Sequence, residues 1–187
     1  MAKALVARQV AYRNSLPIES RADLKFHIAG HSNAGRIMDR MLPLAAAAGL
    51  RYETASFIAA ANHSDPERGA VAAALADRTL GRAIAWSSPE DGIISPLQRP
   101  WKGWGYGSLG ARGWERDAWR KKNRQPIGLR VDAREPVADL ELKQWGAMRQ
   151  RLVTRWFEDH GHSQYWQEGE EREASYRCLA QDWGLVG

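Results

Sequence analysis

The chain has 187 residues, a length that fits one domain, residues 1–187, with a single sizeable core. Hydrophobic residues make up 44% of the chain and charged residues 26%, proportions that are typical of a globular protein and exclude a wholly disordered one. The single cysteine, Cys178, excludes an internal disulfide and any metal site built from several cysteines.

The formal charge of +5 raises the question of a nucleic-acid partner. Basic residues gather beside Trp114 and Trp119, and this pairing of cations with aromatic rings suits phosphate and base contacts. These basic residues are Arg116, Arg120, Lys121, Lys122, Arg124 and Arg130. Acidic residues interleave with basic ones through most of the chain, and no recognised nucleic-acid-reading motif is present. We therefore expect a solvated basic face and no nucleic-acid partner.

No apolar run reaches the ~20 residues that cross a bilayer. The first residues, 1–8, lack the apolar core of a signal peptide. We expect no membrane span and a cytoplasmic location.

Helical and strand patterns alternate along the first half of the chain. Residues 2–18 have apolar positions at helical spacing, and Pro17 with the polar residues behind it should end this helix. A short apolar strand over 24–29 is followed by a helix over 36–42, which Pro43 should end or kink. The next expected elements are a buried strand over 52–61, an alanine-rich helix over 70–80 and a third strand over 82–86. This alternation predicts a parallel sheet with right-handed crossovers.

The second half is less regular. Residues 97–119 mix five glycines with aromatic residues, which predicts a loop. The aromatic residues of this loop either pack it onto the core or line an acyl pocket, and they are Trp101, Trp104, Tyr106 and Trp114. A strand over 127–131, a helical stretch over 135–151, a helix continuation or strand over 152–157 and a closing helix over 174–183 follow. The predicted fold class is α/β, with a mostly parallel sheet of about four to six strands flanked by helices.

The most informative segment is Gly-His-Ser-Asn-Ala at residues 30–34, where the first strand meets the next helix. A serine in a sharp strand-to-helix turn projects its hydroxyl as a nucleophile, and the next amide can face an oxyanion. The turn needs small residues two before and two after the serine, and Gly30 and Ala34 satisfy this. Ser32 could instead serve only as the cap of the helix.

An acid and a histidine follow in the order that such a nucleophile requires. Asp91 comes directly after the third strand, at the strand end where sites of parallel sheets form. His162 lies in a late loop before the last helix. Asp65, after the second strand, is an alternative acid, and His160 is an alternative base that would point away from His162 in an extended loop.

The remaining histidines carry weaker expectations. His27 alternates with apolar strand residues and is expected to be packed or at an edge, and His31 is expected to form a wall of the cleft. Two pairs could begin a metal site, namely His63 with Asp65 and His160 with His162. The sequence places no third and fourth metal ligand at convincing spacing near either pair. We therefore expect no metal and no cofactor.

Three short motifs resemble the α/β-hydrolase family, particularly its esterases and lipases. Gly-His-Ser-Asn-Ala-Gly at 30–35 is similar to the family's nucleophile turn, Asp-Gly-Ile-Ile at 91–94 to the stretch with its acid, and Gly-His-Ser-Gln-Tyr-Trp at 161–166 to the loop with its histidine. The glycine-rich residues 106–113 also resemble a loop between acid and histidine in some members. The resemblance spans residues 22–183 and implies a three-layer sandwich.

The resemblance implies a catalytic role for each motif. Ser32 would be the nucleophile, His162 the general base and then acid, Asp91 the group that holds the imidazole, and the Asn33 amide an oxyanion donor. The implied reaction is hydrolysis of a small-molecule ester or lipid through an acyl-enzyme.

One departure leaves a second interpretation open. The family places several strands, and a loop with a second oxyanion donor, before the nucleophile turn, whereas only a short segment precedes Gly30 here. The chain is then a shortened hydrolase, or a weak or inactive accessory protein on the same scaffold. In the second case the exposed sheet edge would be covered by the helix at 2–16, by another copy or by a partner chain.

Overall fold

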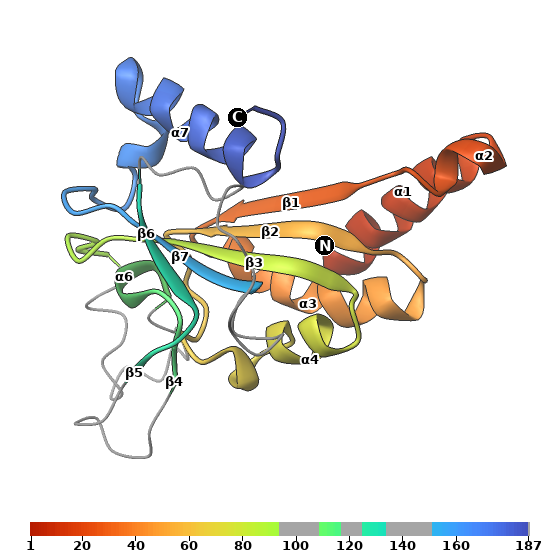
Figure 1. The fold of residues 1–187 in the computed structure, drawn as a ribbon, viewed down its shortest axis with the longest axis horizontal. Helices are drawn as coiled ribbons and strands as arrows, with labels where there is room; N and C mark the ends of the chain where they lie inside the picture. The colour runs from red at the N-terminus through yellow and green to blue at the C-terminus, as the bar shows by residue number, and fades with distance from the viewer. Residues whose placement is uncertain (94–108, 117–124, 134–150, 187) are drawn as a thin grey trace.

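Five strands form one parallel sheet in the computed structural model, which describes residues 1–93, 109–116, 125–133 and 151–186 (Figure 1). Their order across the sheet is β1-β2-β3-β7-β6, and every neighbouring pair runs parallel. The strands are β1 (Phe26–His31), β2 (Tyr52–Ile58), β3 (Leu80–Ser87), β6 (Leu129–Asp132) and β7 (Leu152–Trp156). A separate antiparallel pair consists of β4 (Glu115–Arg116) and β5 (Gln125–Pro126). The predicted α/β class with a mostly parallel sheet is confirmed.

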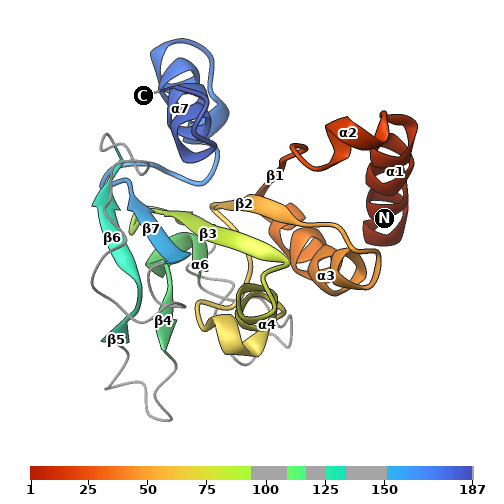
Figure 2. The ribbon, with the colours of Figure 1, turned by 45° about the vertical axis from the view of Figure 1, so that its right-hand side comes forward.

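Helices cover both faces of this sheet (Figures 1 and 2). One face carries α3 (Ala34–Ala47) and α4 (Val71–Ala76), and the opposite face carries α7 (Glu170–Asp182). Helix α1 (Ala2–Ser15) packs on α3 and leads through α2 (Ile18–Arg21) into β1.

Successive residues of β3 face opposite helical layers. Ala83 and Ala85 belong to the core cluster on the side of α3 and α4, whereas Ile84 and Trp86 pack with Cys178 of α7. The four strand residues are fully buried. Burial on both faces explains why β3 is a nearly continuous apolar run rather than an alternating one.

Helix α3 continues through Pro43 to Ala47, so of the two outcomes expected at Pro43, an end or a kink, the end is not observed. Pro43 has no amide hydrogen and therefore costs the helix one internal hydrogen bond. The apolar stripe of α3 is buried on both sides of the proline, at Met38, Met41, Leu42 and Ala45. Tertiary packing of this stripe sustains the helix despite the missing bond.

Other boundaries also differ from the predicted ones. The helix expected over 70–80 is α4, which ends already at Ala76. Arg78 then takes a φ of 65° and turns the chain into β3. The strand expected over 52–61 ends at Ile58, where Ala59 takes a φ of 43°. Residues 152–157, open between helix and strand, form β7 up to Trp156.

Several expectations concern residues outside the described ranges. These include all but the last residue of the helical stretch expected over 135–151 and the aromatic residues Trp101, Trp104 and Tyr106. Four of the six basic residues also lie there, namely Arg120, Lys121, Lys122 and Arg124. In the described part of the predicted loop, residues 109–112 form α6 (Leu109–Arg112) and residues 115–116 form β4, so that part is not all loop. Trp114 is buried and packs edge-on against Phe57, with ring centroids 5.7 Å apart, in agreement with the packing interpretation.

No helix within the described ranges is long and apolar enough to pass through a bilayer.

Candidate active site

The turn after β1 holds Ser32 in a strained backbone conformation. Ser32 has a φ of 55°, a region that non-glycine residues seldom adopt. Two main-chain hydrogen bonds tie the turn to β2 and the loop behind it: the Ser32 amide donates to the Ile58 carbonyl at 2.9 Å, and the Ala61 amide donates to the Ser32 carbonyl at 3.2 Å. A sharp turn that projects the serine side chain requires this kind of backbone.

Small residues surround Ser32 because the helix and strand approach closely there. A Cβ added at Gly30 would lie 2.4 Å from the Met38 sulfur and 3.0 Å from the backbone of Ala34. A Cβ at Gly35 would lie 2.4 Å from the Asn62 Oδ1 atom. After the serine, the position where close packing requires a glycine is therefore Gly35, one residue beyond the Ala34 expected from the sequence.

Neither the side chain of Ser32 nor that of Asn33 caps helix α3. Asn33, not Ser32, occupies the capping position of α3, and no side-chain cap bond forms there, so the capping role considered for Ser32 is not observed. Within the described residues, neither the Ser32 Oγ atom nor the Asn33 amide has a hydrogen-bond partner. The side chain of Ser32 is half-buried. An amide beside the nucleophile can stabilise an oxyanion.

The imidazole of His162 is bonded to the carboxylate of Asp91. His162 Nδ1 lies 2.9 Å from Asp91 Oδ2 and 3.1 Å from Oδ1. Asp91 is fully buried, and its Oδ1 also accepts the amide of Ile93 at 3.2 Å. Because a carboxylate only accepts, Nδ1 carries the hydrogen and Nε2 of the neutral ring is an acceptor. This is the tautomer that a general base for a serine needs.

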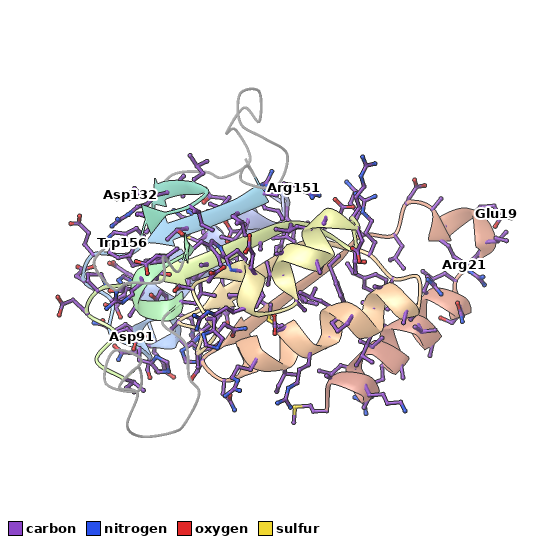
Figure 3. All side chains as sticks on the ribbon, turned by 90° about the horizontal axis from the view of Figure 1, so that it is seen from below. Glu19, Arg21, Asp91, Asp132, Arg151 and Trp156 are labelled. Carbon is purple, nitrogen blue, oxygen red and sulfur yellow. The ribbon has the colours of Figure 1, made fainter. Side chains whose placement is uncertain are left out.

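These residues lie at the same end of the sheet, because each follows the carboxyl end of a parallel strand. Ser32 follows β1, Asp91 follows β3 and His162 follows β7. Figure 3 shows Asp91 at the end of the molecule opposite Glu19 and Arg21. Ser32 Oγ and His162 Nε2 are not joined by a hydrogen bond. In ligand-free enzymes this contact often forms only with substrate bound.

His31 links the turn around Ser32 at residues 30–34, here called the serine turn, to the loop around His162 at residues 158–163, here called the histidine loop. Its Nε2 lies 2.8 Å from the main-chain oxygen of His162, and the two imidazole rings are 4.8 Å apart at 43°. The edge of Trp166 packs against His31, with ring centroids 6.2 Å apart. Burial lowers the pKa of His31. His31 thus makes a specific contact with the loop of His162 that its sequence position did not predict.

The alternative acid and base have other partners. Asp65 Oδ1 accepts the amide of Glu67 at 3.0 Å and caps η1 (Pro66–Arg68). His160 Nδ1 lies 3.2 Å from its neighbour Asp159, and its ring packs on Phe157. His162, not His160, contacts Asp91.

The other histidines stay apart from these residues. His27 stacks on Trp183 with ring centroids 5.4 Å apart, which confirms the packed position expected for it. His63 is exposed. Within the described ranges, no three His, Cys, Asp or Glu side chains converge as metal ligands.

Tyr165 lies beneath the histidine loop and was not singled out from the sequence. Its ring is fully buried and packs on Trp86 and His160, with centroids 6.0 Å and 5.2 Å away. Burial, together with the negative charge of Asp91, raises the pKa of Tyr165 and keeps it neutral. The ring provides an apolar surface beneath the loop. In the sequence, the only sign of this packing role was that Tyr165 lies three residues after His162.

No protein-family model matches the chain, and comparisons with curated proteins and with solved structures return no match. The chemistry of this site must therefore be inferred from its own geometry.

Proposed function

We propose that the protein is a serine hydrolase of the α/β-hydrolase type that cleaves a carboxylic ester. The observation that carries this proposal is the 2.9 Å contact between His162 and buried Asp91, at the end of the sheet where Ser32 also occupies a strained turn. The order of the three residues along parallel strands supports it as well.

The proposed reaction follows from the tautomer of His162. Nε2 takes the hydroxyl proton of Ser32 as Oγ attacks the ester carbonyl, and Asp91 stabilises the imidazolium that forms. The Asn33 amide donates to the oxyanion of the tetrahedral intermediate. The imidazolium then protonates the departing alcohol, which leaves an acyl group on Ser32. A water molecule, deprotonated by His162, releases the acid by the same steps in reverse.

One oxyanion donor is assigned among the described residues, the amide of Asn33. Removal of a single donor costs about 10²–10³ in turnover in hydrolases that have two. We therefore propose a slow esterase for small esters or lipids.

One observation favours a second candidate, an accessory protein with little or no activity. Within the described strands, β1 pairs with β2 alone and forms an edge of the sheet. A free edge can accept a strand from another copy or from a partner chain. Size-exclusion chromatography with light scattering separates the candidates: a reactive monomer favours the enzyme, and an obligate oligomer without reactivity favours the accessory protein.

The direct test is labelling with a fluorophosphonate, which forms a stable adduct with an activated serine. We expect the wild type to be labelled on Ser32, and Ser32→Ala not to be labelled. Ser163→Ala is the matched control, because Ser163 is an exposed serine in the histidine loop without a side-chain cap bond. Absence of label on the wild type, or equal label on Ser32→Ala, would overturn the proposal.

A further inference from the structure

The histidine loop is joined to the serine turn through one side chain, His31. Its Nε2 lies 2.8 Å from the carbonyl oxygen of His162, a residue 131 positions further along the chain. A carbonyl oxygen only accepts hydrogen bonds, so His31 is the donor. His31 is also the residue directly before Ser32.

We propose that His31 is a positioning residue, which holds the imidazole of His162 at the nucleophile by anchoring the main chain of the histidine loop to the serine turn. This role rests on the proposed serine hydrolase function. His31 acts through His162 and does not itself exchange a proton with the substrate.

The loop needs such an anchor because its other described bonds do not fix its distance from Ser32. Asp91 holds the ring of His162 through Nδ1, which orients the ring but leaves the approach of Nε2 to Ser32 open. The remaining described main-chain bonds of the loop are local. The amides of Gln164 and Trp166 donate to the carbonyls of Gly161 and Ser163, and the Gly161 amide donates to the Gln164 side chain. Within the described residues, His31 supplies the bond from a distant element to the main chain of 158–163.

Positioning of this kind has large kinetic consequences. A misplacement of about 1 Å between a base and its nucleophile costs about 10²-fold in rate. The anchor joins the base directly to the residue beside the nucleophile, so a movement of either loop relative to the other would stretch this bond.

Histidine suits the position because it can donate without carrying a charge. The groups that face His31 are the imidazole of His162, the carboxylate of Asp91 and the ring of Trp166. Burial favours the neutral form of His31 by lowering its pKa. A permanent cation here, such as arginine, would oppose the positive charge that His162 gains during the reaction.

The test compares variants that differ in where they place a donor. The amide nitrogen of glutamine corresponds in reach to the Nε2 atom of histidine, whereas that of asparagine corresponds to Nδ1. His31→Gln should therefore keep the bond to the His162 carbonyl, and His31→Asn should lose it. His31→Phe keeps a ring against Trp166 without any donor.

The measurements are the rate of labelling by a fluorophosphonate and the kcat and KM for p-nitrophenyl acetate. We expect His31→Asn and His31→Phe to lower the labelling rate and kcat by about 10–100-fold, with a smaller change in KM. His31→Gln should recover most of the wild-type rate. Thermal unfolding checks that each variant is folded, and if the Asn variant is not, Gln and Phe supply the same comparison.

The possible outcomes separate this role from the function on which it rests. A wild type that is not labelled overturns the proposed function. A labelled wild type whose Asn and Phe variants react at the wild-type rate overturns the role of His31 alone. Equal losses in the Gln, Asn and Phe variants would also overturn it, because the effect would then not depend on the donor.

Discussion

His162 Nδ1 lies 2.9 Å from Asp91 Oδ2, and this contact joins two loops whose residues are 71 positions apart in the chain. The carboxylate is fully buried, and the imidazole is nearly so. A buried acid in contact with the ring fixes its tautomer, which leaves Nε2 as a hydrogen-bond acceptor.

Asp91→Asn should reduce ester hydrolysis by about 10⁴-fold in kcat, because an amide can donate to Nδ1 and favour the wrong tautomer of His162. The assay is hydrolysis of p-nitrophenyl acetate by the folded variant. Asp65→Asn is the matched control, since Asp65 accepts the amide of Glu67 instead. Equal losses in both variants would contradict the assignment of Asp91.

Gly35→Ala should destabilise the protein although it lies in a helix. Alanine normally gains about 0.5–1 kcal/mol over glycine in helices. Here the new Cβ would lie 2.4 Å from Asn62 Oδ1 and 2.8 Å from the Ala60 Cβ atom, and overpacking of this kind costs about 1–3 kcal/mol. We expect urea denaturation to show a net loss of about 1–2 kcal/mol in the free energy of unfolding.

Gly92→Ala is the control for this substitution. Among the described residues, the nearest heavy atom to a Cβ at Gly92 is 4.0 Å away, so its effect should stay within about 0.5 kcal/mol. A Gly35→Ala protein as stable as the wild type would show that the turn can relax around a methyl group.

Arg155→Met should cost about 3–5 kcal/mol of unfolding free energy, because it leaves a buried charge without its partner. Arg155 donates to Asp182 Oδ1 at 2.6 Å and 3.2 Å, and both side chains are fully buried. Trp86 donates to the other oxygen of Asp182 at 2.7 Å. The cluster ties the end of α7 to β3 and β7. Urea denaturation measures the loss.

The exposed pair of Arg51 and Glu53 provides the comparison for this buried pair. Their charged atoms are 4.0 Å apart, and the side chains are 59% and 39% exposed. Glu53→Gln should change the unfolding free energy by less than about 1 kcal/mol. Similar losses from both substitutions would contradict a special contribution from burial.

His27 should make stability depend on pH. Burial lowers the pKa of His27 from its ordinary value of 6.5, with Glu53 opposing the shift and Lys25 adding to it. The unfolded chain then binds more protons than the folded one below that value, so the unfolding free energy falls as the pH falls. His27→Phe keeps the stack on Trp183 without a titrating group.

The measurement is urea denaturation at about pH 7.5 and about pH 5.5. The loss of stability between the two should be smaller in His27→Phe than in the wild type. An unchanged difference would mean that His27 takes up its proton equally well in both states.

Much of the fold followed from local patterns in the sequence. The short apolar runs before Ser32, Asn62 and Ser88 are strands, and the helices between them alternate as expected. The helix end considered at Pro43 is not observed, because a local rule about the missing amide ignores the burial of the apolar stripe around it. Residues 152–157 stayed ambiguous because a short apolar run fits either a helix or a buried strand.

The candidate site also combines features that the sequence predicted with features that only the structure shows. The turn at Ser32 could be predicted from its neighbours alone, since small residues on both sides of a serine between a strand and a helix are a local pattern. The three-dimensional arrangement was needed to show that Asp91 rather than Asp65 contacts His162 rather than His160. The same is true of the contact of His31 with the histidine loop. The reason is physical: residues far apart in the chain meet according to the order of strands in the sheet. That order depends on which faces and edges pack together, which no short stretch of sequence encodes.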